Sequence, residues 1–261
     1  MIKLIDSHAH YDDGKFDAAF EGGADAALEI SFDAGVEAVI NVATNPDNAK
    51  TTLALAERYP NVYAAIGIHP SDCREMDGTA DEILTETEKL LSHPKVVAIG
   101  EVGLDYYWEP YDKSRQAEFF ERQLDMAKAH DLPVIVHCRD AIGDALDIVR
   151  RHEGVRGVFH SFSGSAEVAR ELVSLGWYIS LGGPITYKGA NKVRNAAAAV
   201  PADRLLIETD CPYLPPVPHR GEINYSAYMF FTLSAMAQAT GIAEDRLAAK
   251  LVENTKRLFG I

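Results

Sequence analysis

The chain has 261 residues, with 25 Lys and Arg against 39 Asp and Glu, so its formal net charge is 25 − 39 = −14. Hydrophobic residues make up 47% and charged residues 25%, which is typical of a globular protein and excludes disordered, collagen-like and disulfide-scaffold classes. The acidic balance argues against a protein that coats nucleic acid by general attraction, but not against an enzyme that contacts a few phosphates.

Short apolar runs bounded by Gly, Pro, Asn or Asp recur along the chain, as is typical of buried parallel strands. We expect strands at about Lys3–His8, Glu37–Ala43, Tyr63–Ile68, Val96–Glu101, Pro133–His137, Gly157–His160, Trp177–Leu181 and Arg204–Thr209. Amphipathic patterns fill the intervals. We expect helices at Ala24–Ala34, Asp47–Arg58, Asp81–Leu91, Ser114–Ala129, Asp140–Arg151, Ser165–Leu175, Ala190–Val200, Ser226–Thr240 and Ala243–Phe259.

This alternation predicts an α/β protein, a single-domain (β/α)8 TIM-like barrel over residues 1–261, with about 33 residues per strand–helix unit. A doubly wound open sheet is the alternative. Such a sheet usually carries a Gly-rich phosphate loop after its first strand. Here the first strand runs into His8 and His10 with no such loop, which favours the barrel.

Side chains that can bind metals follow five of the expected strands. They are His8, His10, Glu101, His137, His160 and Asp210. Each has an ordinary structural explanation by itself, such as a hydrogen-bonded core histidine, a buried ion pair or a turn residue. In a barrel, however, the carboxyl ends of all strands meet at one face. Imidazole and carboxylate are ligands of Zn²⁺, Mn²⁺ and similar ions, so the set predicts two divalent cations bridged by Glu101.

Several longer segments carry the same residues. They are Asp6–Asp12, Gly67–Pro70, Gly100–Tyr106, Pro133–Ala141, Phe159–Gly164 and Glu208–Leu214, with the tail Asn254–Phe259. Together they resemble the TatD-type metal-dependent deoxyribonucleases, among the amidohydrolase-like metal barrels, over essentially the whole chain. The resemblance implies a two-metal phosphodiesterase. It implies a first metal on His8, His10, Glu101 and Asp210, and a second on Glu101, His137 and His160.

The chain departs from the family pattern at two places. Many members read His-Pro-His where this chain has His69, Pro70 and Ser71. After the last strand, the loop Arg220–Ser226 keeps Arg-Gly and Asn but has Glu222 in place of a basic residue. Because this loop is expected to border the substrate, the departure bears on substrate preference and leaves the metal ligands unaffected.

The expected reaction is hydrolysis of a phosphodiester in nucleic acid by a hydroxide that two divalent cations (Zn²⁺, Mg²⁺ or Mn²⁺) activate. Asp210 is expected to be both ligand and general base, and Glu101 the bridging ligand. Weaker candidates for orienting a ligand or contacting substrate are Glu208, His69, Arg139, Lys188 and Arg220. Tyr106, Tyr107 and Trp108 are candidates either for stacking on bases or for packing.

Two other classes of function stay open. The same ligand set suits a hydrolase of another ester or amide, including an aminoacyl ester on tRNA, and a barrel can also bind metal without catalysis.

No apolar run of about 18 residues is present, so no membrane span is expected. Three scattered cysteines favour a reducing, cytoplasmic setting. DNA or another phosphodiester is the expected partner, and no obligate protein partner is evident.

Overall fold

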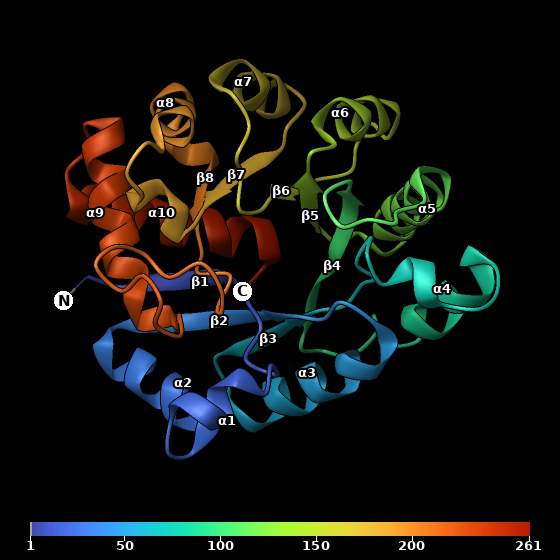
Figure 1. Ribbon diagram of the computed structural model, residues 1–261, viewed down its shortest axis with the longest axis horizontal. Helices are drawn as coiled ribbons and strands as arrows, with labels where there is room; N and C mark the ends of the chain where they lie inside the picture. The colour runs from blue at the N-terminus through green and yellow to red at the C-terminus, as the bar shows by residue number, and fades with distance from the viewer. Residues whose placement is uncertain (1) are drawn as a thin grey trace.

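Eight strands form one parallel sheet, and their order in space is their order along the chain. The computed structural model describes residues 2–261; Met1, the first residue of the expected domain, lies outside them. The strands are β1 (Leu4–Ala9), β2 (Val36–Val42), β3 (Val62–Ala65), β4 (Val96–Asp105), β5 (Val134–Arg139), β6 (Gly157–Phe159), β7 (Tyr178–Leu181) and β8 (Leu205–Ile207). Figure 1 shows the helices around the outside of the strands, so the expected TIM-like barrel is confirmed.

The sheet closes through residues at the ends of β1 and β8. Ala9 and Cys211 form a parallel bridge, and the Asp210 amide donates to the His8 carbonyl at 2.9 Å. Deeper in the barrel, the Ser7 hydroxyl donates to the Ile207 carbonyl at 2.9 Å. These bonds bring the carboxyl ends of the first and last strands together, although about 200 residues separate them in the chain.

The helices cover the outer face of the barrel. Within residues 2–261 they are α1 (Lys15–Ala19), α2 (Gly23–Ala34), α3 (Pro46–Arg58), α4 (Ala80–Glu88), α5 (Lys113–His130), α6 (Ile142–Arg151), α7 (Ala166–Ser174), α8 (Asn191–Ala199), α9 (Met229–Thr240) and α10 (Glu244–Phe259). The short helix α1 was not expected. None of these helices, over the residues that the structure describes, is long and apolar enough to cross a membrane.

Local hydrogen bonds shift some helix starts from the expected positions. Helix α3 begins at Pro46 because the Asn45 side chain caps it, accepting from two backbone amides of the first turn. Helix α9 begins at Met229, three residues later than expected, and residues 226–228 form a 3-10 turn instead. The Ser226 hydroxyl donates to the Asp6 carboxylate at 2.6 Å, which holds this segment against β1.

Alternation along the strands separates the outer core from the barrel interior. Val134 and Val136 of β5 belong to the cluster that packs on the helices, whereas Ile135 belongs to a second cluster inside the strands. Leu258 and Phe259 of α10 join this inner cluster. Because His137 follows Ile135 with the same facing, the apolar interior continues directly into the polar residues at the carboxyl end of the barrel.

Strand β4 runs to Asp105, although the sequence suggested an end at Glu101. Its pairing with β5 steps from Ile99 opposite Val134 to Val102 opposite Val136, so one extra residue bulges at 100–101. Further on, Gly103 has φ +137°, and a Cβ there would lie 2.0 Å from the His137 carbonyl oxygen. The bulge and this glycine let β4 continue closely beside β5 and carry Asp105 to the barrel mouth.

Strand β3 is shorter than expected, since it ends at Ala65 and not at Ile68. The Gln123 side chain of α5 takes over the backbone of Ile68: its Oε1 accepts from the amide at 2.8 Å, and its Nε2 donates to the carbonyl at 3.1 Å. Similarly, β8 ends at Ile207 because the Thr209 amide donates to the Asp6 carboxylate at 3.0 Å. Side chains therefore replace ladder hydrogen bonds around the mouth.

Candidate metal centre

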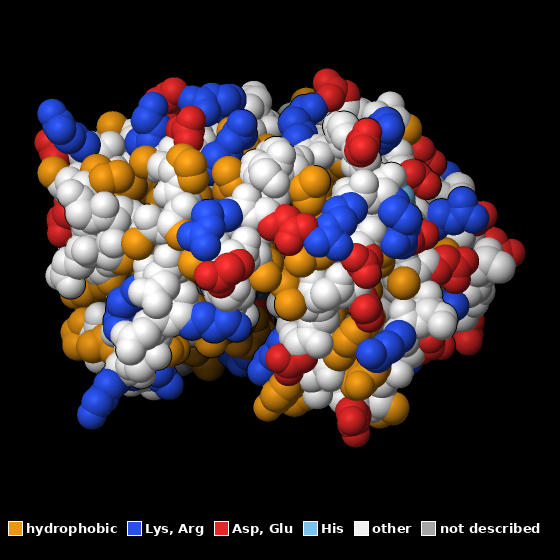
Figure 2. Space-filling view, turned by 90° about the horizontal axis from the view of Figure 1, so that it is seen from above, with side chains coloured by type: hydrophobic (Ala, Val, Ile, Leu, Met, Phe, Trp, Pro, Cys, Tyr) orange, Lys and Arg blue, Asp and Glu red, His pale blue; other side chains and the backbone are white. Residues whose placement is uncertain are grey.

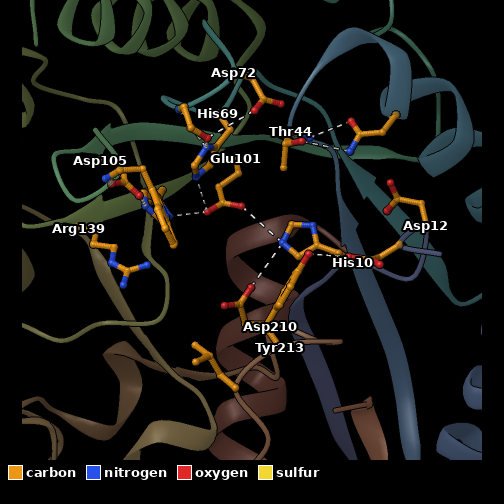
Figure 3. A pocket seen from close by; sticks show the side chains of 16 residues that line it. His10, Asp12, Thr44, His69, Asp72, Glu101, Asp105, Arg139, Asp210 and Tyr213 are labelled. Carbon is orange, nitrogen blue, oxygen red and sulfur yellow. Dashed lines mark hydrogen bonds and ion pairs between the residues drawn. The ribbon is translucent and has the colours of Figure 1, made fainter. Parts of the chain in front are cut away.

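A cavity of about 640 Å³ opens at the carboxyl ends of the strands. It is lined by His10, Asp12, Asp13, Thr44, Asn48, His69, Ser71, Asp72, Glu101, Asp105, Trp108, His137, Arg139, Asp210, Tyr213 and Leu214. Figure 3 shows Glu101 between His10 and Asp210 on one side and His69 on the other. The buried rings of His8 and His160 stack on each other beneath this layer, with centroids 3.9 Å apart.

Glu101 faces a different pair of histidines with each of its oxygens. Oε2 lies 3.4 Å from His8 Nε2 and 3.5 Å from His10 Nε2. Oε1 lies 2.7 Å from His137 Nδ1 and 2.8 Å from His160 Nε2. The first pair also faces Asp210, whose Oδ1 is 3.6 and 3.5 Å from the same two nitrogens. The structure thus brings all six expected ligands together as two groups that share one carboxylate.

Hydrogen bonds on the outer side of the rings determine which nitrogen faces inward with a lone pair. His10 Nδ1 lies 2.8 Å from the Val42 carbonyl oxygen, and His137 Nε2 lies 2.9 Å from Asp105 Oδ2. Since these oxygens only accept, the outer nitrogen of each ring carries the proton. In the neutral rings the inner nitrogens therefore offer lone pairs, and they converge on carboxylate oxygens that are also acceptors.

Such a set of converging acceptors fits divalent cations. The Nε2 atoms of His8 and His10 are only 3.0 Å apart, and lone pairs facing each other at this distance repel unless a cation lies between them. Imidazole nitrogen and carboxylate oxygen are the donors that Zn²⁺ and Mn²⁺ take. The residues present therefore suit the metals that the sequence suggested, with the six side chains as the proposed ligands.

The electrostatics of the metal-free site agree with this assignment. Burial would raise the pKa of Glu101, but the surrounding histidines, His160 first, hold the pKa of this carboxyl well below its usual range. Burial also opposes ionisation of Asp210, yet its hydrogen bond with His10 lowers the pKa of that carboxyl. For His10, burial favours the neutral ring, but Asp210 and Glu101 outweigh it and raise the pKa to about 9. Without metal, a proton on His10 would thus supply the positive charge that a cation supplies when bound.

Metal binding at neutral pH is therefore expected to displace protons. Because the pKa of His10 is raised to about 9, this ring is expected to be protonated at pH 7 without metal and must lose that proton to bind a cation. The apparent metal affinity should therefore fall about tenfold for each unit by which the pH is lowered below that pKa, for each proton displaced. Titrating Mn²⁺ into metal-free protein at pH 7, in buffers of different ionisation enthalpy, should give at least one proton released per chain. A His93→Gln variant, changed far from the site, should release the same number; no release in the wild type would contradict the prediction.

Asp105 is a residue of this site that the sequence reasoning did not select. It is buried at the end of β4, and its Oδ1 accepts from the Tyr107 amide at 2.9 Å while its Oδ2 faces His137. The available signal was the spacing of Glu101, Gly103 and Asp105, which shares one face if the strand continues. Asp105 fixes the ring of His137 so that Nδ1 of the neutral ring presents its lone pair toward Glu101, where the metals are proposed.

Replacing Asp105 by Asn is expected to weaken metal binding about 10- to 100-fold. The amide oxygen can keep the bond from Tyr107, which places the new NH₂ group against His137 Nε2 and favours the wrong tautomer. Metal affinity measured by competition with a chelator tests this. Asp125→Asn is a matched control, because Asp125 faces His152 at 3.6 Å on the surface. Equal metal affinity in the two variants would contradict the role of Asp105.

The remaining candidates lie at different depths. Glu208 is buried, accepts from the Ser161 amide at 2.6 Å and lies 3.5 Å from His160 Nδ1. Arg139 is exposed at the rim and lies over the Tyr107 ring at 3.7 Å. Arg220 lies over the Tyr187 ring at 4.0 Å, outside the lining of the metal cavity. The structure therefore places Glu208 against His160, a proposed ligand, and Arg139 at the mouth, whereas Arg220 is not among the residues that line the cavity.

Comparison with known proteins agrees with the site. The chain is 40% identical over 260 residues to the uncharacterized metal-dependent hydrolase YabD of Bacillus subtilis (strain 168), covering 99% of each chain. It is 37% identical over 260 residues to the uncharacterized metal-dependent hydrolase YcfH of Escherichia coli (strain K12), covering 99% of this chain and 96% of that one. The crystal structure of YjjV, a TatD homolog from Escherichia coli K12, matches with a TM-score of 0.91 and 35% identity, covering 99% and 98%.

The fold and the site define a metal-dependent hydrolase on a (β/α)8 barrel. The family model described as TatD related DNase matches residues 5–260. This chain belongs to the TatD family, which confirms the resemblance seen in its motifs.

Proposed function

We propose that this chain hydrolyses phosphodiester bonds in nucleic acid. The observation that carries the proposal is the placement of Glu101, with one oxygen toward each pair of histidines, which provides for two cations side by side. Two divalent cations held there would polarise the phosphoryl group and lower the pKa of a water, so that hydroxide is available at neutral pH. The matching family model, described as TatD related DNase, supports this substrate class.

Asp210 is the proposed proton acceptor. Its backbone adopts φ +59° just past β8 and is held there by the hydrogen bond from the Asp210 amide to the His8 carbonyl. The carboxylate therefore reaches into the cavity. Only Oδ1 faces His8 and His10, which leaves Oδ2 for a water. Because its pKa is lowered, the group is ionised at neutral pH and can take a proton from that water as it attacks phosphorus.

Substrate contacts are proposed at the rim rather than over the whole surface. Figure 2 looks onto the side of α6, α7 and α8, where Lys and Arg lie among Asp and Glu with no broad basic area. At the mouth, however, Tyr107 and Trp108 are 50% and 60% exposed, and the Arg139 guanidinium lies 3.7 and 5.5 Å from their rings. Exposed aromatic rings beside an arginine suit unpaired bases and their phosphates.

Replacing Trp108 by Ala is expected to raise the KM for a single-stranded oligonucleotide about 5- to 100-fold, since one base–aromatic stack contributes about 1–3 kcal/mol. The kcat and the metal content should change little, because Trp108 lies outside the ligand set. Steady-state kinetics on single-stranded DNA measure both constants. Phe231→Ala is the control, since Phe231 is 40% exposed on α9. An unchanged KM would remove Trp108 from the binding surface.

A second candidate is a smaller ester or amide substrate. Asp12, Asp13 and Asp72 line the same cavity, and these acidic groups disfavour a polyanion on that side. This candidate uses the same ligands, because the metals need only a polarisable oxygen.

The deciding experiment uses the protein stripped of metal and reloaded separately with Mg²⁺, Mn²⁺ or Zn²⁺. Each form is given an end-labelled single-stranded oligonucleotide, an aminoacyl ester and a simple amide. Cleavage of the oligonucleotide that needs both metal and Glu101 would support the nuclease. Turnover of only the ester or the amide, with two metals bound, would replace it by the second candidate.

A further inference from the structure

His69 is oriented differently from the proposed ligand histidines. The amide of Ser71 donates to His69 Nδ1 at 3.1 Å, and the Ser71 hydroxyl lies 2.6 Å from the same nitrogen. A backbone N–H can only donate, so Nδ1 must be the acceptor and carries no proton. The proton of the neutral ring is therefore on Nε2, the nitrogen that faces the cavity.

This donor has no close acceptor among the residues that the structure describes. Nε2 lies 3.6 Å from Glu101 Oε1, beyond hydrogen-bond distance, and the ring meets that of His137 edge-on with centroids 4.4 Å apart. The side chain of His69 is 13% exposed and lines the cavity. An N–H group thus lies beside the Glu101 carboxylate and can donate a hydrogen bond to an acceptor on a ligand in the cavity.

A second neutral donor is fixed next to it. Thr44 Oγ1 accepts from the side-chain amides of Asn45 at 3.3 Å and Asn48 at 3.2 Å, which leaves its own proton to be donated. The His69 amide donates to the Thr44 carbonyl at 2.7 Å, so the ends of β2 and β3 hold the two residues together. Figure 3 shows both side chains at the cavity wall near Glu101.

We propose that Thr44 and His69 form a binding site for a tetrahedral oxyanion, donating hydrogen bonds from Oγ1 and Nε2 to one of its oxygens. This inference rests on the proposed function, in which the oxyanion is the phosphate of the substrate. Neutral donors suit this place. A charged ring would pair with Glu101 and compete for the oxygen that the metals need, whereas a neutral N–H stabilises charge developing on the substrate.

The same hydrogen bonds argue against a third cation. His69, Asp105 and His137 lie close enough to share an ion, with ligand atoms within 4.8 Å of one another. However, His69 Nε2 carries a proton, and His137 Nε2 donates to Asp105. Two of the three atoms therefore offer hydrogens and not lone pairs, so the geometry favours an anion beside His69.

The test measures binding of inorganic phosphate to the metal-loaded protein by calorimetry. His69→Phe and Thr44→Val remove one donor each with little change of shape, and each should weaken phosphate binding about 10- to 100-fold while two metals per chain remain. His69→Gln, which keeps an N–H donor, should recover part of the affinity. His130→Phe and Thr51→Val are matched exposed controls and should bind phosphate as the wild type does.

Nitrogen NMR of the metal-loaded wild type reads the tautomer directly, with the His69→Gln spectrum to assign the signal. An Nε2–H ring is expected. An Nδ1–H ring, loss of a metal in His69→Phe, or unchanged phosphate affinity in both donor variants would overturn the proposal. Failure of the nuclease activity is a separate result, because phosphate affinity and tautomer are measured without turnover.

Discussion

Replacing Glu101 by Gln is expected to remove bound metal from both positions and to lower hydrolysis by more than about a thousandfold. The two oxygens of Glu101 face two different histidine pairs, so one substitution reaches both. Charge stabilisation by a bound cation contributes several kcal/mol to such a reaction, and each 1.36 kcal/mol is about tenfold in rate. Metal per chain and turnover of the oligonucleotide, measured on the same preparation, test this.

Glu88→Gln is the matched control, because Glu88 is exposed on α4 and pairs with His130 on the surface. It should keep both metals and full activity. A Glu101→Gln protein that folds, keeps two metals and remains active would contradict the bridging role. Loss of one metal only would show that a single pair of histidines depends on Glu101.

Asp210→Asn is expected to lower kcat about 100- to 10,000-fold, the range for loss of a general base. The amide keeps an oxygen that can face His8 and His10, so at least the metal on the other side of Glu101 should stay. It cannot take a proton from water, and KM should therefore change less than kcat. A pH–rate profile adds a further readout, since the acidic limb of the wild type should disappear from the residual activity.

The chain offers a control of matching backbone geometry. Asp140 follows β5 with φ +54°, close to the +59° of Asp210, and it lies outside the lining of the metal cavity. Asp140→Asn should leave kcat unchanged. An Asp210→Asn enzyme with wild-type kcat would exclude the base role, whereas loss of all metal would make Asp210 chiefly a ligand.

The order and number of the strands follow from the sequence alone. Buried parallel strands are continuous apolar runs and helices have one apolar stripe, so a run such as Val134–Val136 and the stripe of α5 are recognisable without neighbours. The barrel then implies that the strand ends converge, which is why the sequence alone groups His8, Glu101, His137 and Asp210. This grouping requires only that the strands follow one another around the barrel in chain order, as they do.

Tertiary structure decided what depends on contacts between distant segments. The sequence does not indicate that β4 bulges and continues to Asp105, because the bulge and Gly103 respond to the backbone of β5. Nor does it indicate that Arg220 lies over Tyr187 and outside the lining of the cavity, since a long loop has no periodic pattern to place it. The tautomers of His69 and His137 also depend on tertiary contacts, because hydrogen bonds with Ser71 and Asp105 determine them. Apolar periodicity thus determined the barrel, whereas hydrogen bonds across it decided which side chains offer lone pairs and which offer protons.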